Sequence, residues 1–196
     1  MSVFLKIYPK IKNIFPKKDK PRIRLLKKLP KFTVGAEIGV WQGEFSNKIM
    51  EITHPKELHL IDPWAFQSQF SEWKYGGRDG TKQHDMDLMY QSVIDRFRLK
   101  ENVRIHRGFS EDVLEEFEDN YFDWIYIDGN HRYEFVLKDL NLAFRKVKPH
   151  GLIAGDDYGE KVKDRFPVTE AVQDFVKEKK LKKSLKIIKS QFIIRI

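Results

Sequence analysis

Two short acidic segments could do chemistry, because each follows an apolar run that is typical of a β-strand. Asp128 follows residues 124–127, and Asp156 and Asp157 follow residues 152–154. If the two runs are adjacent parallel strands about 5 Å apart, the three carboxylates converge at one edge of a sheet. Carboxylate oxygens are preferred ligands of hard divalent cations. These acids therefore predict a metal site.

A histidine accompanies these acids. His131 lies three residues after Asp128, in the segment Ile127-Asp-Gly-Asn-His-Arg-Tyr133. Imidazole titrates near neutral pH, so His131 could accept a proton from a hydroxyl group bound beside the acids. The alternatives are that His131 is a turn residue bonded to the backbone, and that Asp156 and Asp157 are a capping or turn pair.

A glycine-containing loop follows the first predicted strand, in the segment Glu37-Ile-Gly-Val-Trp-Gln-Gly43. Gly39 and Gly43 would allow a ligand to approach the backbone closely, although their spacing differs from the G-x-G-x-x-G of dinucleotide-binding proteins. Glu37 suits an ammonium group better than a phosphate. Asp62 ends the next predicted strand and could accept both hydroxyls of a ribose. A ligand with both groups suggests S-adenosylmethionine; the alternative is ordinary strand-end residues.

Alternating strand and helix signals would position these residues. Apolar runs predict strands at 34–40, 57–62, 103–107, 124–127, 152–154, 185–188 and 192–196. Apolar spacing and terminal signals predict helices at 44–52, 85–99, 111–117, 133–147 and 168–180, with Ser110 as the N-cap of the third. This alternation is typical of a doubly wound α/β domain with a mainly parallel sheet. Ligands bind such sheets at the carboxyl ends of the strands.

The charge distribution divides the chain in two. The 196 residues carry a net charge of +8 and predict one domain. Residues 1–30 contain ten Lys or Arg residues and one acid. We therefore predict a basic N-terminal extension at 1–30 and a catalytic domain at 31–196. Pro9, Pro16, Pro21 and Pro30 interrupt the extension too often for one long amphipathic helix.

The basic extension leaves several partners open. It could bind nucleic acid, anionic lipid or an acidic substrate, or be a solvated segment. Nucleic acid is the less favoured partner, because no common nucleic-acid-binding motif is present. Val3, Phe4, Leu5 and Ile7 beside lysines would permit peripheral membrane contact. The absence of cysteines and of a signal-peptide pattern favours a cytoplasmic location.

A long segment at 63–84 separates the second strand from the next helix. Long loops are usually functional or disordered, and the glycines in this one would permit closure over a ligand. We therefore predict a lid, with aromatic packing against the sheet edge as the alternative. Its aromatic residues and glycines are Trp64, Phe66, Phe70, Trp73, Tyr75, Gly76, Gly77 and Gly80.

Four segments together resemble the class I S-adenosylmethionine-dependent methyltransferases. They are Glu37-Ile-Gly-Val-Trp-Gln-Gly43, Leu60-Ile-Asp-Pro-Trp64, Ile127-Asp-Gly-Asn-His-Arg-Tyr133 and Gly155-Asp-Asp-Tyr158. The chain is most similar to the branch that includes the macrocin-type sugar O-methyltransferases and the cephalosporin hydroxylase-like proteins. The resemblance covers roughly residues 33–160. It implies a Rossmann-like seven-stranded sheet of order 3-2-1-4-5-7-6, in which the last inserted strand is antiparallel.

The resemblance also implies roles for the residues named above. S-adenosylmethionine would be bound by residues of the first loop, the strand tips and the adenine side, namely Glu37, Gly39, Gly43, Asp62, Ser110 and Asp128. A divalent metal, usually Mg²⁺, would be held by Asp128, Asp156 and Asp157. His131 would be the general base, with Asp128 as its catalytic neighbour.

Together these features predict a metal-dependent O-methyltransferase. Its acceptor would be a hydroxyl group of a sugar or other small polyol-like molecule, such as a nucleotide sugar or a glycolipid precursor, and we expect a homo-oligomer. One alternative is a metal-independent small-molecule methyltransferase. Another is a nucleic-acid- or membrane-associated protein with a degenerate donor site.

Overall fold

The computed structural model describes residues 20–67 and 82–196. Two expectations lie outside these residues. The first is membrane contact through Val3, Phe4, Leu5 and Ile7. The second is the greater part of the lid, with Phe70, Trp73, Tyr75, Gly76, Gly77 and Gly80. None of the helices in the described ranges is long and apolar enough to cross a membrane.

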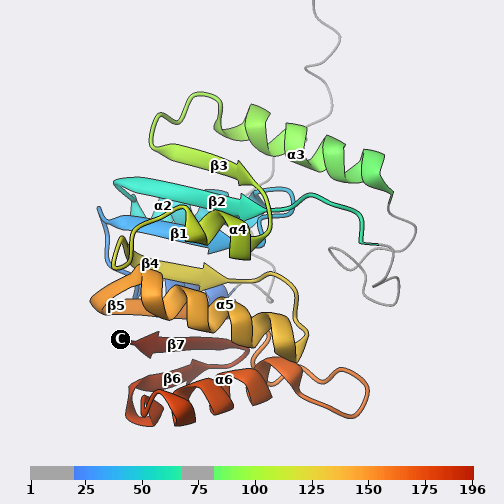
Figure 1. The fold of residues 1–196 in the computed structure, drawn as a ribbon. Coiled ribbons are helices and arrows are strands. Elements are labelled where there is room, and N and C mark those ends of the chain that lie inside the picture. The colour runs from blue at the N-terminus through green and yellow to red at the C-terminus, as the bar shows by residue number, and fades with distance from the viewer. Residues whose placement is uncertain (1–19, 68–81) are drawn as a thin grey trace, which may run out of the picture.

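Seven strands form one sheet in the order β3-β2-β1-β4-β5-β7-β6 (Figure 1). This confirms the order that the resemblance implied. Strand β7 runs antiparallel to both neighbours, and the remaining pairs are parallel. The strands are β1 (Val34–Ile38), β2 (Glu57–Asp62), β3 (Val103–Arg107), β4 (Phe122–Ile127), β5 (Val147–Gly155), β6 (Leu185–Ile188) and β7 (Gln191–Arg195).

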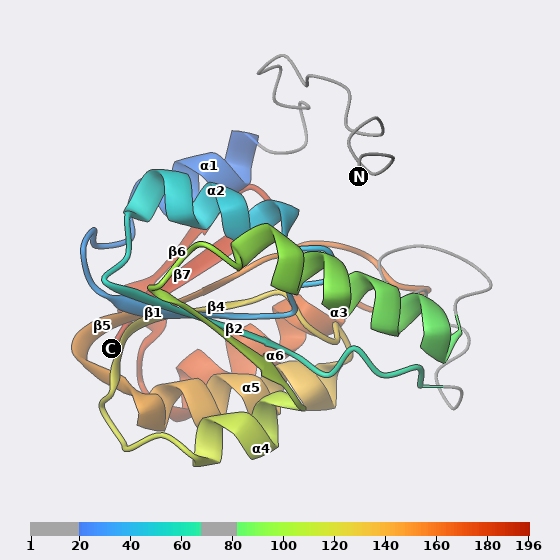
Figure 2. The same ribbon diagram turned by 90° about the horizontal axis from the view of Figure 1, so that it is seen from above.

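Helices cover both faces of this sheet, as expected of a doubly wound domain. Helices α1, α2 and α3 lie on one face and α4, α5 and α6 on the other (Figure 2). The predicted helices are confirmed with small shifts at their ends. The observed helices are α1 (Lys20–Leu26), α2 (Glu44–Thr53), α3 (Gln83–Phe97), α4 (Ser110–Glu115), α5 (Tyr133–Lys146) and α6 (Pro167–Glu178), followed by the short 3₁₀ helix η4 (Lys182–Ser184).

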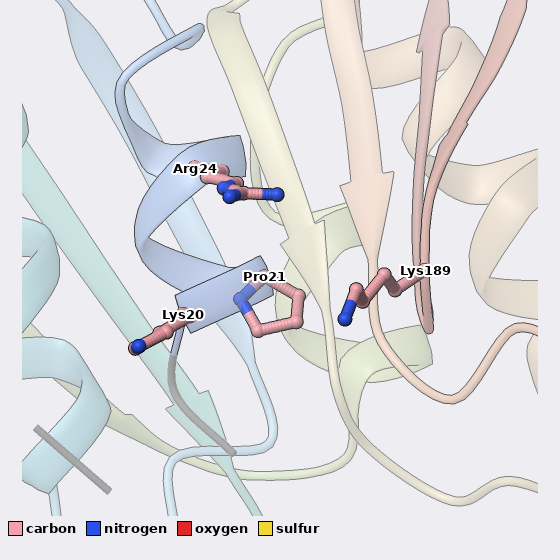
Figure 3. Close-up of a pocket in the computed structure, with 4 residues that line it drawn as sticks. All are labelled: Lys20, Pro21, Arg24 and Lys189. Atoms are coloured by element: carbon pink, nitrogen blue, oxygen red, sulfur yellow. The ribbon is translucent and has the colours of Figure 1, made fainter. Parts of the chain in front are cut away.

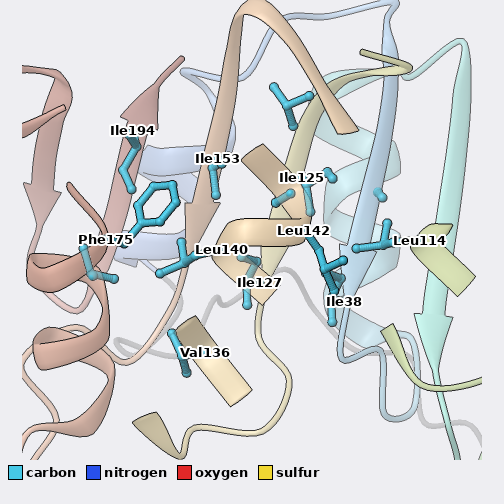
Figure 4. Close-up of a cluster of buried hydrophobic side chains, with 14 of the residues drawn as sticks. Ile38, Leu114, Ile125, Ile127, Val136, Leu140, Leu142, Ile153, Phe175 and Ile194 are labelled. Carbon is cyan, nitrogen blue, oxygen red and sulfur yellow. The ribbon is translucent and has the colours of Figure 1, made fainter. Parts of the chain in front are cut away.

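The two strands that end at the acids are held in the middle of a close-packed core. Ile125 and Ile127 of β4 and Ile153 of β5 pack with Leu140 of α5 and Phe175 of α6 (Figure 4). A second cluster fills the opposite face, beneath α1, α2 and α3. Parallel strands covered on both faces are apolar along most of their length, so polar side chains appear where each strand leaves the core.

Helix α1 lies within the predicted basic extension and was not predicted. It packs against α2, β6 and β7. Leu25 and Leu26 are fully buried there, and Leu29 just after the helix is almost so. Pro21 does not prevent the helix, because proline is tolerated in a first turn, where its missing N–H would have no partner. Burial of the leucines anchors α1 to the domain.

The junction of α4 and α5 corrects one expectation. Ser110 is not the N-cap of α4: it lies inside the helix, and its hydroxyl donates a hydrogen bond to Asp139 Oδ1 at 2.5 Å. Asp139 is a buried acid on α5. Burial raises the pKa of Asp139 to about 7, against the opposing effect of the Ser110 hydrogen bond. This carboxyl group therefore loses its proton near neutral pH.

The packing of α1 predicts a large loss of stability in Leu26→Ala. We expect the free energy of unfolding to fall by about 2–5 kcal/mol, the usual cost of truncating a leucine in a close-packed core. Leu88→Ala on α3 is the matched control, because Leu88 is 57 % exposed and its truncation should cost less than about 0.5 kcal/mol. Urea denaturation measures both. Equal, small effects would show that α1 does not pack on the domain in solution.

Asp139 predicts a dependence of stability on pH. The folded protein binds a proton between the ordinary pKa of 3.8 and the folded pKa of about 7. The stability contribution of Asp139 is therefore present at low pH, declines as the pH rises through this window and is lost above about pH 7. Asn carries no charge to bury, so Asp139→Asn should gain about 1–3 kcal/mol relative to the wild type between pH 5 and pH 8. Urea denaturation at both pH values tests this; a constant difference would contradict it.

Candidate functional site

The sheet brings two of the predicted acids together at neighbouring strand tips. Strands β4 and β5 are paired in parallel, with Ile127 opposite Gly155. Asp128 and Asp156 are the next residues of the two strands. The backbone N–H of Asp156 bonds the carbonyl of Ile127 at 3.2 Å, which continues the pairing to the point where the acids leave the sheet.

A cation that the sequence analysis did not identify lies between these acids. Arg22 of α1 donates from Nη2 to Asp128 Oδ2 at 2.9 Å and from Nε to Asp156 Oδ2 at 2.5 Å. Its guanidinium also lies over the ring of Phe45, 5.0 Å from the centroid. Burial alone would lower the pKa of Arg22, but the charges of Asp128 and Asp156 raise it above its ordinary value. Arg22 therefore carries a permanent positive charge into the cluster.

Asp156 is held by the β6–β7 hairpin as well as by Arg22. Its Oδ1 accepts hydrogen bonds from Gln191 Nε2 and from Ser190 Oγ, the latter at 3.2 Å. Gln191 in turn accepts a bond from the Tyr126 hydroxyl at 2.7 Å. Only 6 % of Asp156 is exposed. This carboxylate is therefore turned toward the hairpin and α1.

Asp157 turns the other way and meets the predicted base. His131 Nδ1 lies 2.7 Å from Asp157 Oδ2, and His131 Nε2 lies 3.4 Å from Asp128 Oδ1. Burial alone would lower the pKa of His131, but the contacts with the two acids outweigh it and raise the pKa to about 10. Imidazolium is therefore the form present at neutral pH in this arrangement.

The charges of the cluster nearly cancel. Three carboxylates, those of Asp128, Asp156 and Asp157, face two cations, Arg22 and protonated His131. One negative charge remains in excess. Burial also raises the pKa of Asp128, because a carboxylate loses its hydration there, while His131 and Arg22 act in the opposite direction.

The donor atoms of this cluster fit a divalent cation. One ligand atom from each of Asp128, His131 and Asp157 can be chosen so that all lie within 4.8 Å of one another. His131 Nε2 is buried, and its 3.4 Å contact with Asp128 Oδ1 is an ion pair without the geometry of a hydrogen bond. Asp156, the third predicted metal ligand, is not in this group, because Arg22 and the hairpin hold its carboxylate. A cation bound by all three predicted acids would have to displace Arg22.

The glycine loop after β1 is pressed against the strand tip that carries Asp128. Gly39 has φ of +87°, and a Cβ atom there would overlap the backbone carbonyl of Asp128. Gly43 also has positive φ, +73°, where α2 begins. Only glycine adopts such conformations without steric cost. The loop is thus the wall of the site next to the acids.

Asp62 and Glu37 are buried acids whose hydrogen bonds hold this loop and the start of α2 in place. Asp62 Oδ2 accepts the backbone N–H groups of Val40 and Trp41 at 2.9 and 3.0 Å, and Oδ1 accepts that of Trp64 at 2.8 Å. Glu37 is buried and accepts a hydrogen bond from Ser46. Burial raises the pKa of Glu37 well above its ordinary value, and the Ser46 bond opposes this rise.

Two further predicted residues flank the cluster. Ser110 is linked to the cluster through its hydrogen bond to Asp139. Asp139 Oδ2 lies 3.7 Å from the point where a Cβ atom would lie if Gly129, the residue after Asp128, had a side chain. Trp64 is fully buried and donates from its indole to the carbonyl of Trp41 at 2.8 Å. Trp64 is therefore part of the site's scaffold, and its expected place in a lid is wrong.

Known proteins resemble this chain in sequence or in overall fold. The "Uncharacterized protein R132" of Acanthamoeba polyphaga mimivirus is 28% identical over 122 residues, and the match spans 62% of this chain and 50% of the viral protein. The chain thus spans about half the length of that relative. Among solved structures, the O-methyltransferase NovP superposes with a TM-score of 0.63 at 19% identity, covering 89% of this chain and 79% of NovP.

A second solved structure and a family model complete the comparison. A SAM dependent methyltransferase from Aquifex aeolicus superposes with a TM-score of 0.54 at 15% identity, covering 90% of this chain and 88% of the other. At this level of identity, both superpositions establish the fold alone. The family model described as "Methyltransferase domain" matches residues 36–158. The chain therefore belongs to the methyltransferase domain family, and its sheet has the strand order of the class I S-adenosylmethionine-dependent enzymes.

Proposed function

We propose that this protein is a metal-dependent O-methyltransferase that moves the methyl group of S-adenosylmethionine to a hydroxyl of a sugar or other small polyol-like acceptor. One observation carries the proposal. Asp128, Asp157 and His131 form a compact group of oxygen and nitrogen donors, and the backbone of that group is in contact with the glycine loop. A methyl donor in the loop would thus lie beside groups that can bind and deprotonate an alcohol.

The donor would bind along the tips of β1, β2 and β4. Methyl transfer from a sulfonium needs little activation of the donor, so the protein's main task is to hold donor and acceptor in line. The Gly39 region leaves no side chain between the loop and Asp128. Asp62 already accepts three backbone N–H groups, those of Val40, Trp41 and Trp64, so a ribose hydroxyl would share Oδ1 with Trp64 or displace one of these bonds. The residues proposed to contact the donor are Glu37, Gly39, Gly43, Asp62, Ser110 and Asp128.

The acceptor would bind on the acidic side. Asp128 and Asp157 would hold a divalent cation, with Asp156 joining them when Arg22 leaves. A bound divalent cation supplies a Lewis acid that lowers the pKa of a coordinated hydroxyl and fixes its direction. Mg²⁺ suits oxygen ligands, which leaves His131 available for proton transfer. A vicinal diol of a sugar has the two oxygens such a site would take.

His131 would then receive the hydroxyl proton. Asp128 and Asp157 hold the His131 proton so firmly, with a pKa of about 10, that the imidazole is a base only after their charge is neutralised. A cation bound to these two carboxylates would return the pKa of His131 toward its ordinary value. Metal dependence and base catalysis are thus linked through the same two acids.

Arg22 supports a second candidate, a metal-independent methyltransferase. Its guanidinium already occupies the position between Asp128 and Asp156 and could orient an acceptor without a metal. The two candidates differ in their response to metal removal. Methyl transfer to nucleotide sugars can be measured by the amount of S-adenosylhomocysteine formed. A metal-dependent enzyme should need added Mg²⁺ and lose activity in EDTA, whereas a metal-independent enzyme should remain active in EDTA.

If Asp128 and Asp157 act on the acceptor, their substitution should lower turnover and leave the affinity for S-adenosylmethionine nearly unchanged. Asp128→Asn or Asp157→Asn should reduce turnover by at least about a hundredfold, because each removes charge from the group that activates the acceptor. Calorimetry should show an affinity for S-adenosylmethionine within about tenfold of the wild type, since one hydrogen bond is worth about 1 kcal/mol. Asp95→Asn, on the exposed side of α3, is the control. Full activity of both site variants would remove the acids from the mechanism.

Competition with Arg22 predicts tighter cation binding in Arg22→Gln. The substitution removes a resident positive charge and releases Asp156, so the affinity for Mn²⁺, measured by electron paramagnetic resonance, should rise by about tenfold or more. Arg24→Gln removes the same charge from the same helix and should leave the Mn²⁺ affinity nearly unchanged. An unchanged or weaker affinity in Arg22→Gln would mean that the cation does not bind where Arg22 lies.

A further inference from the structure

A basic hollow lies beside the acidic cluster, on the side formed by α1 and the β6–β7 hairpin. It is lined by Lys20, Pro21, Arg24 and Lys189 and has a volume of about 230 Å³. In Figure 3 the Lys189 amine reaches toward Pro21, and the Arg24 guanidinium extends from α1 toward the same space, whereas the Lys20 amine points away. Two cations from separate parts of the chain thus face one cavity.

The cations of this hollow have no acidic partner in the described ranges. Among the described residues, ion pairs are found for Arg22 and for many surface lysines and arginines, but none for Lys20, Arg24 or Lys189. Lys20 and Arg24 are also four residues apart on one helix, a spacing at which like charges repel. A bound anion would relieve this repulsion, and the described residues that line the hollow include no carboxylate.

The hollow is adjacent to the proposed site of methyl transfer. Arg22, between two of its lining residues, and Ser190, next to Lys189, both donate hydrogen bonds to Asp156. Arg22 and Arg24 lie about 200° apart around α1, so a ligand anchored in the hollow would reach the acids along the hairpin, past Ser190. Arg22 also shields an anion in the hollow from Asp128 and Asp156, because it neutralises part of their charge.

We propose that this hollow binds the phosphate or diphosphate group of the methyl acceptor. This inference rests on the proposed function and narrows its substrate class to phosphorylated sugars or polyols. Arginine binds phosphate oxygens in a fork and lysine adds a point charge, so Arg24 and Lys189 provide a complementary pair. The phosphate would be anchored here while the hydroxyl to be methylated lies at Asp128 and Asp157. The phosphate belongs either to a soluble nucleotide sugar or to a lipid carrier.

The test compares R24Q/K189Q with R98Q/K100Q. The second pair carries the same loss of charge, but Arg98 and Lys100 are exposed after α3 and have no ion pair among the described residues. Calorimetric titration with inorganic pyrophosphate should show binding that weakens by about tenfold or more in R24Q/K189Q and by less than about twofold in R98Q/K100Q. Equal pyrophosphate affinity in the wild type and R24Q/K189Q would overturn the proposal.

Three further measurements identify the acceptor and separate this proposal from the proposed function. If the acceptor is a soluble nucleotide sugar, the affinity for uridine diphosphate glucose should fall in R24Q/K189Q as the affinity for pyrophosphate does. If the acceptor is on a lipid carrier, the protein should float with vesicles of phosphatidylcholine and phosphatidic acid, and less of R24Q/K189Q should do so. S-adenosylmethionine affinity should be the same in R24Q/K189Q and the wild type. Absence of S-adenosylmethionine binding in the wild type would overturn the proposed function, whereas the loss of pyrophosphate binding in R24Q/K189Q would still establish the phosphate site.

Discussion

Repulsion among carboxylates at the ends of two adjacent strands is the constraint on which this site depends. Parallel strands fix Asp128 and Asp156 side by side, and such a pair is unfavourable unless positive charge accompanies it. The protein supplies that charge from two directions, with Arg22 from α1 and His131 from the loop after β4. One negative charge remains in excess, which is consistent with the further cation that we propose for this site.

The same strand tips determine what can lie next to this charge. Gly39 allows the loop after β1 to touch the backbone of Asp128, and Asp62 holds that loop by its backbone N–H groups. A donor molecule on the loop and an acceptor at the acids would therefore be neighbours without a large conformational change. Helix α1 lies on the side that we propose for the acceptor, where it brings Arg22 to the acids and Arg24 to the basic hollow.

Local sequence patterns sufficed to predict the strands, most of the helices and the position of the acids, whereas the strand order came from the family resemblance. The patterns failed for contacts between distant segments. An apolar run that ends in Asp128 predicts a strand tip because a buried strand becomes polar where it leaves the core. Arg22 lies 106 residues from Asp128 and has no comparable signature. Helix α1 was also missed, because the four prolines of the extension argued against a long helix there. The adjacent apolar residues Leu25 and Leu26 were the available indication of a short buried helix. Gln191, a polar residue at the start of an apolar strand, was the other available indication of a partner for Asp156.

The most direct measurement is a crystal structure with Mn²⁺ and S-adenosylhomocysteine, using the anomalous signal of the metal. We expect the metal between Asp128 and Asp157, with Arg22 moved away from Asp156 and the nucleoside along the loop that contains Gly39. A crystal with the nucleoside bound, Arg22 still joined to both acids and no anomalous density there would contradict the metal-dependent account.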